Sequence, residues 1–148
     1  MDGINKTVQA VFDKAIYLID AQSESTGATR TSDTKEYEVR TIGILNHLLD
    51  EVYPASDTYV QAGDGTRPAL PDVTAFTDEL DLDARILRNV LPLGLAANLL
   101  LEENAEIANF FQQRYEENLA LAMTKKPADD GAVENVYGGI EYGQFSQW

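Results

Sequence analysis

The side chains that could carry catalysis are few. The chain has one histidine, His47, and no cysteine. The lack of cysteine excludes disulfide scaffolds, cysteine-ligated zinc, iron–sulfur clusters and cysteine nucleophiles, and a single histidine excludes any one-chain site that needs two. As a general base, His47 would need a nucleophile and an orienting acid placed by the fold, and no serine stands in a GxSxG context. We interpret His47 as a structural or surface residue.

Carboxylates gather in one part of the chain, at Asp78, Glu79, Asp81 and Asp83. Oxygen-rich clusters can bind calcium or magnesium, but the EF-hand spacing, with its glycine and its terminal bidentate glutamate, is not met. Helix capping accounts for Asp81 and Asp83 without a metal. We therefore expect no catalytic residue, no metal site and no cofactor. An enzyme that uses this cluster with a divalent ion is kept as an alternative.

Segment 63–68, Gly-Asp-Gly-Thr-Arg-Pro, could suggest a phosphate loop. It lacks the GxxxxGK[ST] pattern and does not lead from a strand into a helix. We interpret it as a glycine-rich turn.

The composition limits the classes of partner. The chain has 148 residues, with 25 Asp+Glu against 11 Lys+Arg and a formal net charge of -14. This length suits one domain with one core. The acidity argues against a nucleic-acid reader, which needs a basic face, and against binding to an anionic membrane surface. The chain shows neither a signal peptide nor a long apolar span, so we expect it in the cytoplasm of the cell that makes it.

Four segments have the apolar spacing of amphipathic helices. They cover residues 4–21, 33–53, 82–101 and 105–124. Polar residues that suit helix N-termini precede or begin them, namely Asp2, Asp33 (with Glu36 as a capping box), Asp81 and Asn104. The expected fold is therefore all-α, a small bundle of about four helices.

The third of these segments contains Pro92, which removes a helical hydrogen bond and should kink or split the helix. Leu91, Leu95 and the run 99–101 then make this segment apolar nearly all round, which is typical of a helix buried in a core or against another subunit. In the fourth segment, one stripe is apolar and Pro127 follows its end.

Two segments lack helical spacing. Residues 54–80 form a long loop with three prolines and two glycines, in which 57–62 is a weak candidate for a strand. A loop of this length in a compact domain is usually functional or ordered by a partner.

Residues 127–148 form a second, extended segment that follows a helical domain over 1–126. This C-terminal arm has four carboxylates, four aromatic side chains and no basic residue. Disordered tails are typically poor in aromatics, so the arm is expected to dock, either back on its own bundle or on another subunit. The expected docking residues are Tyr137, Ile140, Tyr142, Phe145 and Trp148.

The C-terminal half resembles a known family. Segment 91–103, Leu-Pro-Leu-Gly-Leu-Ala-Ala-Asn-Leu-Leu-Leu-Glu-Glu, is similar to the buried helix of head–tail connector (adaptor) proteins of tailed phages. Segment 108–117 is similar to their next, more polar helix. Segment 136–140 and the aromatic end resemble the arm with which such proteins grip the portal. The resemblance covers about residues 82–148.

The resemblance implies a structural protein of the virion rather than an enzyme. The members of that family are small helical proteins that assemble as rings, usually of twelve copies, below the portal protein. They extend the DNA channel and carry the tail or stopper protein, so the expected location is the head–tail interface of the virion, after assembly in the host cytoplasm. Carboxylates facing the channel would let DNA pass without specific binding. The alternative is an acidic regulatory or interaction protein that binds a basic partner.

Overall fold

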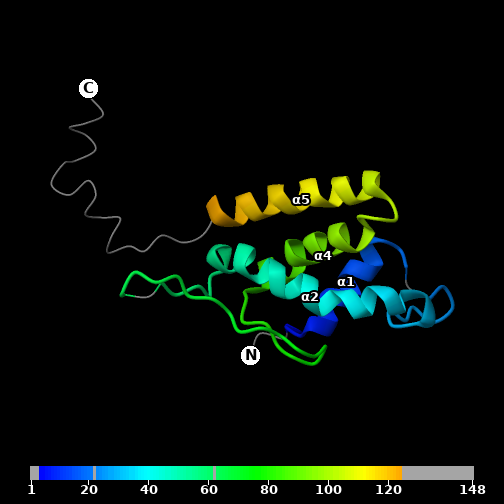
Figure 1. Cartoon of the computed structure of the whole chain (residues 1–148), viewed down its shortest axis with the longest axis horizontal. Helices are drawn as coiled ribbons and strands as arrows, with labels where there is room; N and C mark the ends of the chain where they lie inside the picture. Colours follow the sequence, from blue (N-terminus) through cyan, green and yellow to red (C-terminus); the bar gives the residue numbers. More distant parts are fainter. Residues whose placement is uncertain (1–3, 22, 62, 125–148) are drawn as a thin grey trace, which may run out of the picture.

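The computed structural model describes residues 4–21, 23–61 and 63–124, and within them the fold is all-α. The elements are α1 (Val8–Leu18), η1 (Ser32–Thr34), α2 (Lys35–Val52), η2 (Tyr53–Ala55), α3 (Ala84–Asn89), α4 (Leu91–Leu100) and α5 (Ala105–Thr124) (Figure 1). The small all-α bundle that the sequence predicts is confirmed.

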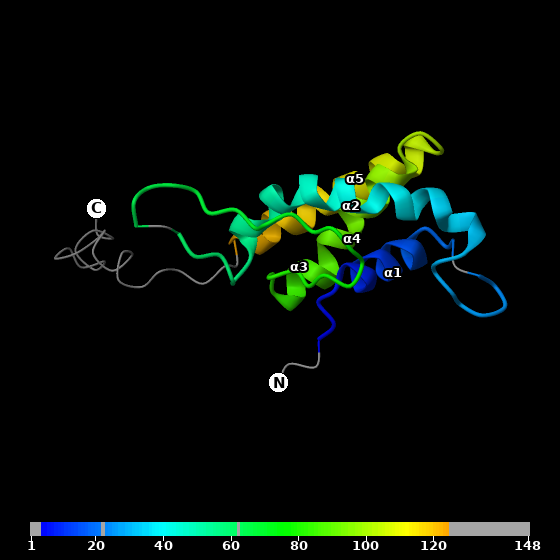
Figure 2. The ribbon, with the colours of Figure 1, turned by 60° about the horizontal axis from the view of Figure 1, so that its bottom comes forward.

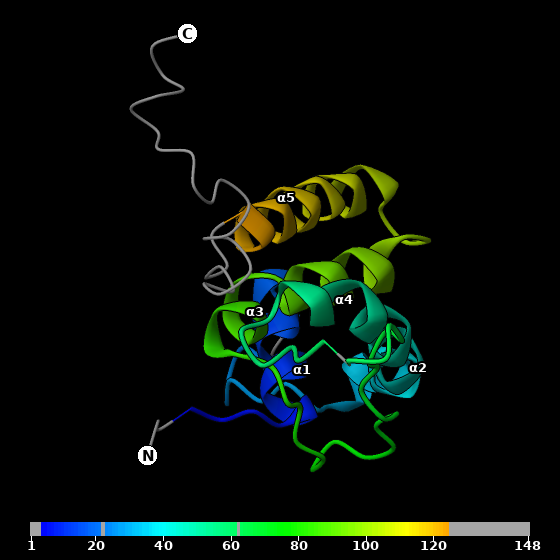
Figure 3. The same ribbon diagram turned by 90° about the vertical axis from the view of Figure 1, so that its left-hand side faces the viewer.

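Helix α4 is the centre of the bundle. Apart from Asn98 and Leu100, every one of its residues is buried, as its nearly uniform apolar composition predicts. Figure 3 shows α5 along one side of α4, with α1 and α2 on the other side.

The predicted third helix is two helices, α3 and α4, because of Pro92. The backbone turns at Val90 (φ -119°, ψ -60°), and Pro92 is the second residue of α4. In the first turn of a helix, a missing N–H breaks no helical hydrogen bond. The proline therefore ends one helix and is well tolerated in the next.

Helix α1 begins later than predicted because the long loop binds its first N–H groups. The predicted cap, Asp2, lies outside the described residues, and Thr7 is the cap: its hydroxyl oxygen accepts a hydrogen bond from the third helical N–H at 3.2 Å. The first two N–H groups donate to the carbonyls of Asp78 (3.0 Å) and Phe76 (2.9 Å). Helix N-termini always leave such donors without internal partners, and here a distant segment satisfies them.

Helix α1 also ends earlier than predicted, at Leu18 rather than Ala21. Asp20 adopts the left-handed conformation (φ 57°). The N–H of Ala21 donates to the carbonyl of Ile16 (3.0 Å), and that of Asp20 donates to Tyr17 (3.1 Å). These two bonds form the Schellman motif, which usually has glycine at the left-handed position.

A capping box precedes α2, but Thr31 and Thr34 form it rather than Asp33 and Glu36. The Thr34 hydroxyl accepts from the Thr31 N–H at 2.9 Å, and the Thr31 hydroxyl accepts from the Asp33 N–H at 3.2 Å. The box opens η1, which continues directly into α2.

The two remaining caps were predicted with different success. Helix α3 is capped by Asp83 rather than Asp81, with the Asp83 carboxylate accepting from the Ile86 N–H at 3.0 Å. Helix α5 has the predicted bounds and the predicted cap: Asn104 Oδ1 accepts from the Ile107 N–H at 3.2 Å.

The second half of the loop over 54–80 belongs to the core. Val73 and Leu80 are buried, and the Asn46 side chain on α2 both donates to and accepts from the Val73 backbone (3.0 and 2.8 Å). No strand forms over 57–61, and the one isolated bridge in the described residues joins Thr7 to Glu79. Most described residues over 60–61 and 63–72 are exposed, and this part of the loop projects past the end of α2 (Figure 2).

Candidate interaction site

The five docking residues that the sequence predicts, Tyr137, Ile140, Tyr142, Phe145 and Trp148, lie outside the described residues. The same holds for the whole arm over 127–148. The two other candidate groups, His47 and the acidic cluster, are placed by the structure. His47 is exposed in the middle of α2.

The acidic cluster is used for local structure. The Asp78 carboxylate accepts from the N–H groups of Thr74 (2.7 Å) and Ala75 (3.1 Å), and these bonds lower its pKa. Burial of the Asp83 carboxyl opposes ionisation, but hydrogen bonds from Asp57, Ile86 and Ser56 outweigh it and lower its pKa. Over the described ranges, no group of three His, Cys, Asp or Glu side chains is placed to hold a metal ion.

A cationic pocket lies between α5 and the opposite wall formed by α1 and α3. Its volume is about 560 Å³. The charged side chains that line it are Lys14, Arg85, Arg88 and Arg114, which are four of the chain's 11 Lys+Arg. The apolar lining consists of Leu18, Val90, Leu93, Leu121 and Ala122, with Asn89 and Asn118 between. Among the described residues no carboxylate lines the pocket, although carboxylates outnumber bases by more than two to one in the chain.

These cations differ from the arginines that stabilise the fold. Arg30 pairs with Glu38 at 3.1 Å and lies over the Phe76 ring, and Arg40 donates to the carbonyls at the end of α4. By contrast, the side chains of Lys14, Arg85 and Arg88 have no hydrogen bond or ion pair with any described residue. Their charges are therefore available to an external or separately placed anion.

The fourth cation of the pocket is partly engaged. Arg114 on α5 lies over the ring of Phe110 at 5.8 Å from the centroid. A cation–π contact of this kind positions a guanidinium without neutralising its charge.

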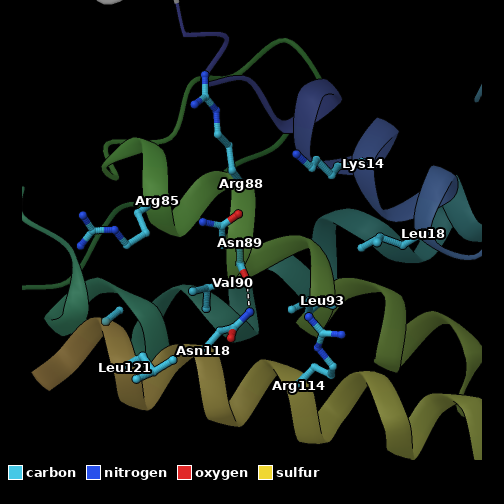
Figure 4. Close-up of a pocket in the computed structure, with 11 residues that line it drawn as sticks. Lys14, Leu18, Arg85, Arg88, Asn89, Val90, Leu93, Arg114, Asn118 and Leu121 are labelled. Atoms are coloured by element: carbon cyan, nitrogen blue, oxygen red, sulfur yellow. Dashed lines mark hydrogen bonds between the residues drawn. The ribbon is translucent and has the colours of Figure 1, made fainter. Parts of the chain in front are cut away.

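The helix break at Val90 and an interhelical hydrogen bond shape the pocket. The Asn118 amide on α5 donates to the carbonyl of Asn89, the last residue of α3, at 2.9 Å. This bond satisfies one of the free carbonyls at the end of α3 and holds α3 beside α5. Figure 4 shows Arg114, Asn118 and Leu121 on the α5 side of the pocket and Lys14, Arg85 and Arg88 across from them, with the Arg88 side chain directed away from α5.

Apolar side chains continue from the pocket onto the surface. Leu18 and Leu121 are 41% and 52% exposed at its edge. Further along the same face of α5, Ile107 and Phe110 are also exposed. Exposed apolar groups that adjoin one another mark interaction surfaces, so the pocket and α5 together form the candidate interaction site.

Sequence reasoning did not identify this pocket. The available signal was the pair Arg85 and Arg88, three residues apart in an acidic chain, since this spacing puts two side chains on one helix face. Their approach to Lys14 and Arg114 depends on the tertiary packing of three helices and has no local signal.

Comparison of the chain with protein-family models, with curated proteins and with solved structures returned no match. None of the helices over the described residues is long and apolar enough to cross a membrane.

Proposed function

We propose that this chain is a structural subunit of a tailed-phage head–tail connector, which forms a ring of usually twelve copies between the portal and the tail or stopper protein. It has no catalytic role in this proposal. DNA passes through the ring without specific binding, and the subunit is assembled in the host cytoplasm and ends at the head–tail interface of the virion.

The observation that supports this proposal most is the place of segment 91–103, which carries the resemblance. This segment is the buried helix α4 and the turn that leads into α5. The Asn98 amide donates to the Gly94 carbonyl at 2.8 Å, and Glu103 accepts from Tyr37 on α2 at 2.6 Å. The first bond lies within α4, and the second joins the turn after α4 to α2.

Charge and surface character agree with a subunit of a ring. A formal net charge of -14 in each copy suits a channel wall that repels phosphates rather than holding them. The exposed apolar side chains of α5 suit contacts between subunits, where such groups become buried.

The test is assembly of the full chain with the portal protein encoded in the same genome. We expect density for a ring below the portal in electron micrographs and co-sedimentation of the two proteins. Deleting residues 128–148 should abolish portal binding while the helical circular dichroism and the cooperative melt remain. Phe145→Ala and Trp148→Ala in the full chain should weaken binding without changing the melt.

Two outcomes would contradict the proposal. A full chain that stays small and does not bind the portal favours the alternative, an acidic interaction protein with a basic partner. Stabilisation of the chain by calcium or magnesium would favour the metal-dependent alternative, because a ligand that binds only the native state raises stability.

A further inference from the structure

The cationic pocket has the chemistry of a peptide site rather than of a phosphate site. Its charges come from Lys14, Arg85, Arg88 and Arg114, but about half of its lining residues are apolar. A phosphate backbone would satisfy the charges and leave the apolar half in water. A peptide that carries both carboxylates and apolar side chains would satisfy both parts, since guanidinium groups bind carboxylates with directed hydrogen bonds.

The chain itself contains a segment of this composition. Residues 127–134, Pro-Ala-Asp-Asp-Gly-Ala-Val-Glu, have three carboxylates, three small apolar side chains and no basic residue. They follow α5 almost directly, and the pocket is lined by Leu121 and Ala122 in the last turn of that helix. Five extended residues span roughly 17 Å, so Asp129 and Asp130 can reach the pocket of their own chain.

We propose that residues 127–134 dock into the cationic pocket of their own chain, with Asp129, Asp130 and Glu134 neutralising its cations. Because the segment is covalently tethered, its effective concentration at the pocket is in about the millimolar range, which favours docking within one chain over docking into another copy. Docking would fix the direction in which the aromatic residues 137–148 leave the bundle. This inference stands apart from the connector function, since the segment could dock in a protein that binds no portal.

The test places a nitroxide spin label in the full chain. Because the chain has no cysteine, Ala132→Cys gives a single attachment point. We expect paramagnetic broadening of the amide signals of Asn89 and Asn118, which lie in the pocket. Charge reversal of the pocket by R85E/R88E should lower the docking equilibrium constant roughly tenfold, since two attractions become repulsions, and about 0.5 M salt should also reduce the broadening.

The matched control is K35E/R67E, which changes the net charge equally at two exposed positions outside the pocket and should leave the broadening unchanged. A second variant, K14E/R114E, tests the same pocket from α1 and α5 in case R85E/R88E disturbs the short helix α3. Circular dichroism melts of all variants report on folding.

Three results would overturn the inference. The first is the absence of broadening, or broadening that both pocket variants leave intact. The second is broadening of ¹⁵N-labelled chains by separate spin-labelled chains, which would assign the pocket to the arm of a neighbouring copy. The third is a short DNA duplex that binds the full chain through Arg88 without displacing the label, which would assign the pocket to nucleic acid.

Discussion

At the scale of single residues, Gly94 decides how closely α4 and α5 pack. A Cβ atom added at Gly94 would lie 2.8 and 2.9 Å from two ring carbons of Tyr115 and 3.1 Å from a methyl carbon of Leu48. The Tyr115 ring cannot easily move, because it is buried and its hydroxyl donates to Glu51 at 2.7 Å. Position 94, which lies in the segment that resembles the connector family, therefore needs a residue without a side chain.

Gly94→Ala should lower the free energy of unfolding by about 1–3 kcal/mol, the usual range for an overpacked core. Urea unfolding followed by circular dichroism measures this change in the free energy of unfolding. Gly43→Ala is the matched control, because Gly43 lies within α2 and has no atom within 4 Å of an added Cβ. Alanine there should stabilise the protein by about 0.5–1 kcal/mol. Equal effects of the two substitutions would show that contact of the added methyl group with Tyr115 and Leu48 is not the cause of the loss.

At the scale of elements, the success of the sequence predictions depended on how local each signal was. Helix α5 has the predicted bounds because its cap, its periodicity and its end are all encoded within its own residues. Helix α1 was predicted too long at both ends. Its start is set by Phe76 and Asp78, about 70 residues away in the chain, and its end by an aspartate in a conformation that usually needs glycine. Neither feature has a pattern that spacing reveals.

The contribution of a helix cap to stability can be tested directly at Asp83, the cap of α3. Asp83→Ala removes the bond to the Ile86 N–H and also those from Ser56 and Asp57. We expect a loss of about 0.5–2 kcal/mol in the free energy of unfolding near pH 7, as for other lost caps. Asp81→Ala is the control, since no hydrogen bond of the Asp81 side chain occurs among the described residues.

The effect of Asp83→Ala should depend on pH with a defined sign. The folded pKa of Asp83 lies below its ordinary value of 3.8. Its contribution is therefore complete above the ordinary pKa and is lost as the pH falls through the folded pKa. The unfolding curves of wild type and variant should converge in acid, and a constant difference down to pH 2 would contradict the role of the carboxylate.

At the scale of the whole molecule, side-chain hydrogen bonds join α2 to the rest of the bundle near both of its ends. Tyr37 near its start donates to Glu103 in the turn between α4 and α5, and Glu51 near its end accepts from Tyr115 on α5. Burial and the neighbouring glutamate raise the pKa of each tyrosine, that of Tyr37 to about 12. The amphipathic spacing of α2 predicted the helix, but these tyrosine–glutamate bonds join residues more than 60 positions apart and have no sequence pattern.

The same bonds predict how the bundle responds to alkali. Between the ordinary tyrosine pKa of 10.0 and the folded value of about 12, Tyr37 is ionised in the unfolded chain but protonated in the native one. The unfolded chain then binds fewer protons, so the free energy of unfolding falls as the pH rises through this window. Urea unfolding at pH 9 to 12 should show the wild type losing more stability than Tyr37→Phe, because phenylalanine has no proton to lose. Glu103→Gln, which keeps an acceptor but removes the charge, should lie between the two. If wild type, Tyr37→Phe and Glu103→Gln lose stability in parallel, the alkaline sensitivity arises elsewhere and the Tyr37–Glu103 hydrogen bond contributes nothing to it.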